Sequence, residues 1–206
     1  MQPETEQRLL EMLEREELFD LVRRERFARD QGRFDVMREC FHDDAYVRTS
    51  WYDGKGGAAY VDSSRAFMQK VRGGKHWVFP AFARINGDRA TVESPAMIFN
   101  RAKLEDIAVD FHVFCRFFSR CVREDGSWKI MSFEVLFERD VMSAMNPREA
   151  LPIDWDRLES FRPSYCFLSY LQGSRGITVN QNLLGDDRPE ELTTFHDGEE
   201  AWLASK

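Results

Sequence analysis

The sequence has no long apolar stretch, no excess of positive charge and no obvious address signal. No run approaches the roughly 18 apolar residues that a transmembrane helix needs. Lys and Arg number 29 against 36 Asp and Glu, and the net charge of −7 argues against a general nucleic-acid binder and against an anionic membrane surface as partner. Residues 1–6 are acidic and lack the basic-then-apolar order of a signal peptide, so we expect a cytoplasmic protein.

Several motifs of catalysis and cofactor binding are also missing. The four cysteines include no pair separated by two residues, so we expect reduced, structural thiols. No glycine-rich phosphate loop follows a predicted strand, and no Gly-x-Ser-x-Gly nucleophile elbow is present. No two of the four histidines have the spacing of a zinc site. The sequence therefore supports neither a dinucleotide-binding domain, nor a serine hydrolase, nor a zinc enzyme.

Aromatic side chains are plentiful, at 13% of the 206 residues with 17 Phe, and they need a core, a pocket or a partner to cover them. Apolar residues at helical spacing predict three helices, over 4–30, 33–41 and 58–72. Alternating β-branched and aromatic residues predict strands and an antiparallel meander, over 45–52, 76–85, 89–99, 109–123 and 128–137. This order predicts an α+β fold, because helices and strands do not alternate as they do in a Rossmann domain.

The composition changes near Asn146, where proline becomes more frequent. We therefore expect a main domain over 1–146 and a C-terminal extension over 147–206 with helices at 155–172 and 189–204. The extension is too apolar to be a free tail. It either covers the main domain as a lid or forms an interface with a partner subunit.

Glu25 shares the buried face of the first helix with Leu18, Leu21 and Val22, by the i, i+3, i+4, i+7 rule. Burying a carboxylate alone is costly, so Glu25 needs a partner or a wet cavity. A salt bridge to a neighbouring arginine would satisfy it without any role in function. A functional role for the carboxyl group is the other possibility.

Asp30 and His76 also occupy unusual places. Asp30 lies in the last turn of its helix, where a negative charge opposes the helix dipole; it either caps the following helix or serves function. His76 begins the first strand of the meander and enters an aromatic-rich face, where a structural histidine is the plainer interpretation. From the residues alone, both alternatives stay open at each position.

Four short segments resemble the SnoaL-like branch of the nuclear transport factor 2-like superfamily, over about residues 16–140. They are the helix junction Asp30-Gln31-Gly32-Arg33-Phe34-Asp35, the strand entry Phe41-His42-Asp43-Asp44-Ala45, the strand head Lys75-His76-Trp77 and the final hairpin Glu124-Asp125-Gly126-Ser127-Trp128-Lys129-Ile130. The resemblance implies a cone-shaped, curved antiparallel sheet packed on N-terminal helices. The extension lies outside the family's core.

Scytalone dehydratase, bile acid 7α-dehydratase and hexachlorocyclohexane dehydrochlorinase, which belong to this family, use an Asp–His pair at the places of Asp30 and His76. The resemblance implies that His76 is a general base and that Asp30 fixes its tautomer and stabilises the imidazolium. It also implies a dehydratase-like lyase or isomerase of secondary metabolism. Such an enzyme acts on a hydrophobic cyclic or polyketide-like substrate, without metal or organic cofactor, and forms a homodimer or higher homo-oligomer.

Two positions depart from the family pattern. The dehydratases carry Tyr, and the dehydrochlorinase Lys, five residues before the Asp, where this chain has Glu25. Scytalone dehydratase has a second His in its third strand, where this chain has Asn100. Assistance to the leaving group would then fall to Glu25, if burial protonates it, or to Asn100. With Trp51 and Phe117, these residues form the expected substrate-binding set.

Two further functions remain open, because a fold does not determine chemistry. One is a non-catalytic small-molecule binding protein of the same fold, which predicts that Asp30 and His76 do not touch. The other is a small structural subunit of a ring-hydroxylating dioxygenase, which shares the fold although the sequence shows no convincing match to it.

Overall fold

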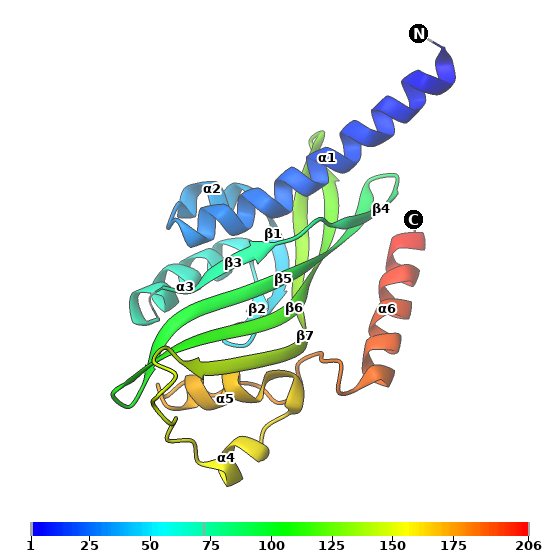
Figure 1. Cartoon of the computed structure of the whole chain (residues 1–206). Coiled ribbons are helices and arrows are strands. Elements are labelled where there is room, and N and C mark those ends of the chain that lie inside the picture. The colour runs from blue at the N-terminus through cyan, green and yellow to red at the C-terminus, as the bar shows by residue number, and fades with distance from the viewer. Residues whose placement is uncertain (1, 72, 206) are drawn as a thin grey trace.

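The computed structural model describes residues 2–71 and 73–205. Figure 1 shows a curved sheet, with helices from the N-terminal part of the chain along one side and helices of the C-terminal extension below and beside it. The first helix, α1 (Pro3–Asp30), begins with Pro3 and runs as a single long rod. Its first half extends away from the body, and its second half packs with α2 (Phe34–Glu39), which packs in turn with α3 (Gly57–Lys70).

The sheet has seven strands in the order β2-β1-β7-β6-β5-β3, with β4 paired to β5. Their bounds are β1 (Phe41–Arg48), β2 (Asp53–Lys55), β3 (Lys75–Val78), β4 (Phe82–Asn86), β5 (Arg89–Leu104), β6 (Ile107–Glu124) and β7 (Ser127–Ala144). All pairings are antiparallel except that of β1 with β7, which is parallel. The predicted α+β fold with a curved meander is confirmed, and the parallel pair makes the sheet mixed.

The strand predicted over 76–85 is two strands, because proline interrupts it. Pro80 lies between β3 and β4 and has no N–H to donate to a ladder. The predicted helix over 155–172 is wrong in the same way: it divides into α4 (Trp155–Glu159), a 3₁₀ turn over Pro163–Tyr165 and α5 (Cys166–Gly173). Arg162 is extended, with ψ near 134°, which is the conformation favoured before proline.

The apolar core continues from the sheet into the extension. Tyr165 and Leu168 are buried in the same hydrophobic cluster as Leu18 and Phe137, and the rings of Phe137 and Tyr165 lie 5.0 Å apart. The last helix, α6 (Pro189–Ala204), packs on the sheet through a smaller cluster, in which Phe195 meets Phe118. The extension therefore packs on the main domain, and a division at residue 146 stays a prediction.

The sequence predicted neither disulfide bonds nor a transmembrane helix. Cys40, Cys115, Cys121 and Cys166 are all free thiols, as expected. Within residues 2–71 and 73–205, no helix combines the length and the apolar character needed to cross a membrane.

Candidate active site

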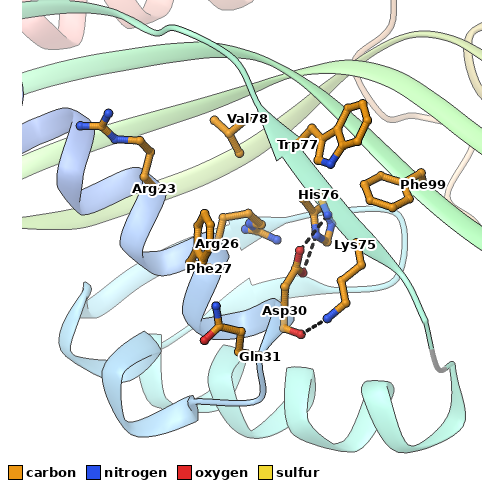
Figure 2. A pocket seen from close by; sticks show the side chains of 10 residues that line it. All are labelled: Arg23, Arg26, Phe27, Asp30, Gln31, Lys75, His76, Trp77, Val78 and Phe99. Carbon is orange, nitrogen blue, oxygen red and sulfur yellow. Dashed lines mark hydrogen bonds and ion pairs between the residues drawn. The ribbon is translucent and has the colours of Figure 1, made fainter.

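Asp30 and His76 meet where the end of α1 faces the start of β3 (Figure 2). The main-chain N–H of His76 donates to Asp30 Oδ2 at 2.7 Å, and Asp30 Oδ1 lies 2.6 Å from His76 Nδ1. The Lys75 ammonium donates to the main-chain carbonyl of Asp30, so the carbonyl end of α1 receives a positive charge. Asp30 does not cap the next helix, whose N-cap residue Arg33 has no side-chain capping bond.

The contact with Asp30 decides which nitrogen of His76 is free. A carboxylate accepts a hydrogen bond, so Nδ1 carries the proton and Nε2 keeps its lone pair. Burial, together with the charges on Arg26 and Arg29, lowers the pKa of His76 to about 3, although Asp30 acts in the opposite direction. Burial acts to raise the pKa of Asp30, but its hydrogen bonds with His76 hold that pKa below the ordinary value. At neutral pH the pair is therefore a neutral imidazole beside a carboxylate.

Two buried arginines of α1 flank this pair. Arg26 lies over the rings of Phe117 and Phe133, at 5.0 and 4.7 Å from their centroids, and 2.9 Å from Glu25 Oε2. Arg29 lies 5.6 Å from the Trp51 ring centroid and 3.7 Å from Asp30 Oδ1. Glu25 and Asp30 thus each have a guanidinium beside them, as buried charges require.

His76 lines a cavity of about 340 Å³ inside the cone, which we call the inner cavity. Its apolar wall comes from the β1–β2 loop, α3, β5, β6 and α5 and includes Trp51, Phe67, Ile98, Phe111, Leu168 and Leu171. The leucines belong to the extension, so α5 forms part of the cavity wall. The size and the apolar lining are typical of sites for small organic ligands.

A second pocket of about 310 Å³ opens on the other side of His76, between α1 and β3 (Figure 2). Phe27 and Trp77 line this outer pocket and are 68% and 56% exposed, and Lys75 and Phe99 complete its rim. His76 therefore lies between the interior of the cone and an apolar area of the outer surface.

The predicted site residues fall into two groups. Trp51 and Asn100 line the inner cavity together with His76. Phe117 contacts the His76 ring, with centroids 5.8 Å apart, but it and Glu25 line a small separate void of about 10 Å³ and not the inner cavity. Burial raises the pKa of Glu25, although Arg26 acts to lower it. The ion pair between Glu25 and Arg26 agrees with the salt-bridge interpretation of this carboxylate.

The sequence pattern did not mark the buried arginines of α1 or the polar residues that the extension adds to the cavity. Arg26 lies one helical turn before Asp30, so the same i, i+4 rule that placed Glu25 on a buried face could have placed Arg26 beside Asp30. Gln172 and Arg175 line the inner cavity from the end of α5, and no motif in the sequence marks them. Among the residues that the structure describes, no group of three or more His, Cys, Asp or Glu side chains is placed to hold a metal ion.

A family model described as a SnoaL-like domain matches residues 10–134 of this chain. The chain is also similar to pea pathogenicity protein 2 of Fusarium vanettenii, with 30% identity over 201 residues that cover 94% of this chain and 85% of that protein. The family model ends before the extension, whereas the fungal protein also matches part of the extension.

Solved structures show the same fold at low sequence identity. A scytalone dehydratase-like protein of Novosphingobium aromaticivorans is 24% identical, with a TM-score of 0.50, and the match covers 73% of this chain and 97% of that one. A type 3 hexachlorocyclohexane dehydrochlorinase of Novosphingobium barchaimii is 14% identical, with a TM-score of 0.57, and covers 70% and 99% respectively. At these identities the likeness concerns the fold alone.

Proposed function

Because the chain belongs to the SnoaL-like domain family, we propose that it is a small-molecule lyase or isomerase, and specifically a cofactor-free dehydratase. One observation carries the proposal: the Asp30 carboxylate holds His76 Nδ1 at 2.6 Å on the wall of an apolar cavity of about 340 Å³. A fixed, neutral imidazole with one free nitrogen is the form that a general base requires. The aromatic wall suits a hydrophobic cyclic or polyketide-like substrate.

In this mechanism, His76 Nε2 takes a proton from the carbon next to a carbonyl group. The electrons of the broken C–H bond form a carbon–carbon double bond, and the bond to the neighbouring hydroxyl group breaks. The proton on Nε2 then passes to the departing hydroxide, which leaves as water. The Asp30 carboxylate stabilises the imidazolium that exists between these two transfers, against the repulsion of Arg26 and Arg29.

Assistance to the leaving group falls to Asn100 in this proposal. Asn100 lines the inner cavity, and its side-chain amide N–H groups can donate a hydrogen bond to the departing oxygen. Glu25 lies behind Arg26 and does not line that cavity, so we do not assign it contact with the substrate.

The test is replacement of His76 by Ala and by Gln. On a panel of cyclic β-hydroxy ketones, followed by the absorbance of the conjugated product, we expect about a hundredfold loss of turnover or more. A cooperative thermal melt shows that each variant is folded. Replacement of His196, which lies on α6 outside the cavity, is the matched control and should keep full activity. Full turnover by His76→Ala on any substrate of the panel would refute the mechanism.

The non-catalytic binding alternative predicts separation of Asp30 and His76, and the contact at 2.6 Å gives it no support. No specific feature favours a dioxygenase subunit. We include a homo-oligomer in the proposal, because exposed Phe27, Trp77 and Phe82 leave apolar surface uncovered. The proposed cytoplasmic location rests on composition.

A further inference from the structure

We infer that the ligand of the inner cavity is a ring compound that carries a carboxylate, bound by Arg29 and Arg175. The inference rests on the proposed function only in taking the inner cavity as the binding site. It adds the chemical class of the ligand, which neither the Asp30–His76 pair nor the family specifies.

The polar part of the cavity wall is positively charged. Among the described residues that line it, Arg29 and Arg175 are the charged side chains with a fixed charge, and no carboxylate is present. The Asp30 carboxylate lies 3.7 Å from Arg29 but does not line the cavity, and His76 binds both of its oxygens. An apolar cavity with cations and no anion favours an anionic ligand.

Of the two arginines, Arg29 gives the stronger argument for an anionic ligand, because its side chain is only 6% exposed. Its Nε is buried and has no hydrogen-bond partner among residues 2–71 and 73–205. A guanidinium has five N–H donors in a planar fork that matches a carboxylate. A buried guanidinium is costly unless an anion pairs with it. The Asp30 carboxylate lies 3.7 Å away, and a ligand carboxylate in the cavity would add a second partner.

Arg175 reaches the same cavity from the extension, just after the end of α5. It forms no ion pair within the part of the chain that the structure describes. The two cations therefore come from α1 and from the extension, so a bound carboxylate would connect the main domain to the element that covers it. This gives the extension a role in ligand recognition besides its packing.

Two buried amide oxygens complete the recognition pattern. Gln172 Oε1 and Asn100 Oδ1 have no hydrogen-bond partner among the described residues. The amide nitrogen of Gln172 donates to Ser50 Oγ at 3.3 Å, which leaves the oxygen to accept. Two amide acceptors and two cations from residues that line the same cavity suit a ligand with a hydroxyl group as well as a carboxylate. The ligand class is thus a hydroxylated cyclic acid.

The test compares 2-naphthoate with 2-naphthamide, which share one ring system and differ in charge. Binding is measured by isothermal titration calorimetry at pH 7 with the full chain. We expect the acid to bind at least tenfold more tightly than the amide. Arg29→Met should remove most of this preference, Arg29→Lys should retain part of it, and Arg175→Met should weaken the acid about threefold. Arg148→Met, an exposed change outside the cavity, should leave it unchanged.

Three results would overturn the inference: equal binding of acid and amide, a preference that survives in Arg29→Met Arg175→Met, and no binding of either probe at 1 mM or below. A thermal melt of each variant shows whether it is folded, and Arg175→Met, at an exposed position, tests the idea independently of the buried Arg29. Binding needs no turnover and is repeated in His76→Gln. A preference that persists there, with no dehydratase activity in the native protein, would refute the proposed function and leave the inference intact.

Discussion

Asp30 binds His76 with both carboxylate oxygens, one to the main-chain N–H at 2.7 Å and one to ring Nδ1 at 2.6 Å. The first bond fixes the start of β3 relative to the end of α1, and the second fixes the tautomer of the ring. One side chain thus sets both the position and the tautomer of the proposed base. Mutations of Asp30 can test these two roles separately.

Asp30→Asn should keep the position and change the tautomer. The amide oxygen still accepts from the main-chain N–H, but the amide nitrogen facing Nδ1 can only donate, so the ring proton moves to Nε2. We expect at least a hundredfold loss of turnover with a melting temperature within a few degrees of native. Asp30→Ala, which removes both bonds, should also lower the melting temperature. Turnover of Asp30→Asn near the native rate would contradict the assigned tautomer.

The pH dependence of activity should lack the usual histidine limb. Because burial lowers the pKa of His76 to about 3, the ring stays unprotonated well below pH 6.5. We expect kcat/KM to stay flat between about pH 5 and 7 where the protein is folded, and the ring carbon resonances of His76 to show no titration there. A rate that falls with a midpoint near pH 6.5, together with titration of that ring, would contradict this picture.

The lowered pKa of His76 also makes the free energy of unfolding depend on pH. Between about pH 3 and the ordinary histidine value near 6.5, the unfolded chain binds a proton at this position and the folded chain does not. The contribution of His76 to the free energy of unfolding is therefore lost as the pH falls through that range. His76→Gln should have a shallower dependence of stability on pH than the native protein, which chemical denaturation at several pH values would show.

Local sequence patterns predicted most of the helices and strands and two residues of the candidate site, Asp30 and His76. Helical spacing predicted α1 and placed Glu25 on its buried face. The family motifs predicted that Asp30 and His76 lie together. The pattern left open whether Glu25 pairs with a neighbouring arginine or serves function, because periodicity predicts which side of a helix is buried and not which group a buried side chain contacts; the structure pairs Glu25 with Arg26.

The sequence could not show which residues of the extension line the inner cavity, for a different reason. Its apolar residues predicted packing, but the path of the chain from β7 to α5 depends on contacts across more than a hundred residues of sequence, such as that of Gln172 with Ser50. Single prolines also decided where helices and strands break, and the effect of Pro163 on the residue before it outweighed the helical pattern around it.

Asp140 on β7 should give the opposite pH dependence to His76. Its Oδ2 accepts from the main-chain N–H of Leu168 at 2.6 Å, and burial raises its pKa to about 6 despite this bond. The folded chain then binds the extra proton, so the stabilising contribution is present at low pH and is lost as the pH rises through about 6. Relative to the native protein, Asp140→Asn should gain roughly 2 kcal/mol of unfolding free energy between pH 4 and pH 8. A difference that does not change with pH would contradict this.

Gly57 is required by the close approach of α3 to β1. A Cβ at this position would lie 2.5 Å from the carbonyl oxygen of His42 and 2.8 Å from Phe41 Cβ. Since the first of these is backbone, the helix itself would have to shift, and we expect Gly57→Ala to lower the free energy of unfolding by about 1–3 kcal/mol. Gly198→Ala on α6 is the matched control, because nothing lies within 4 Å of its Cβ position. That change should raise stability by up to about 1 kcal/mol, and equal effects of the two substitutions in urea unfolding would refute the steric argument.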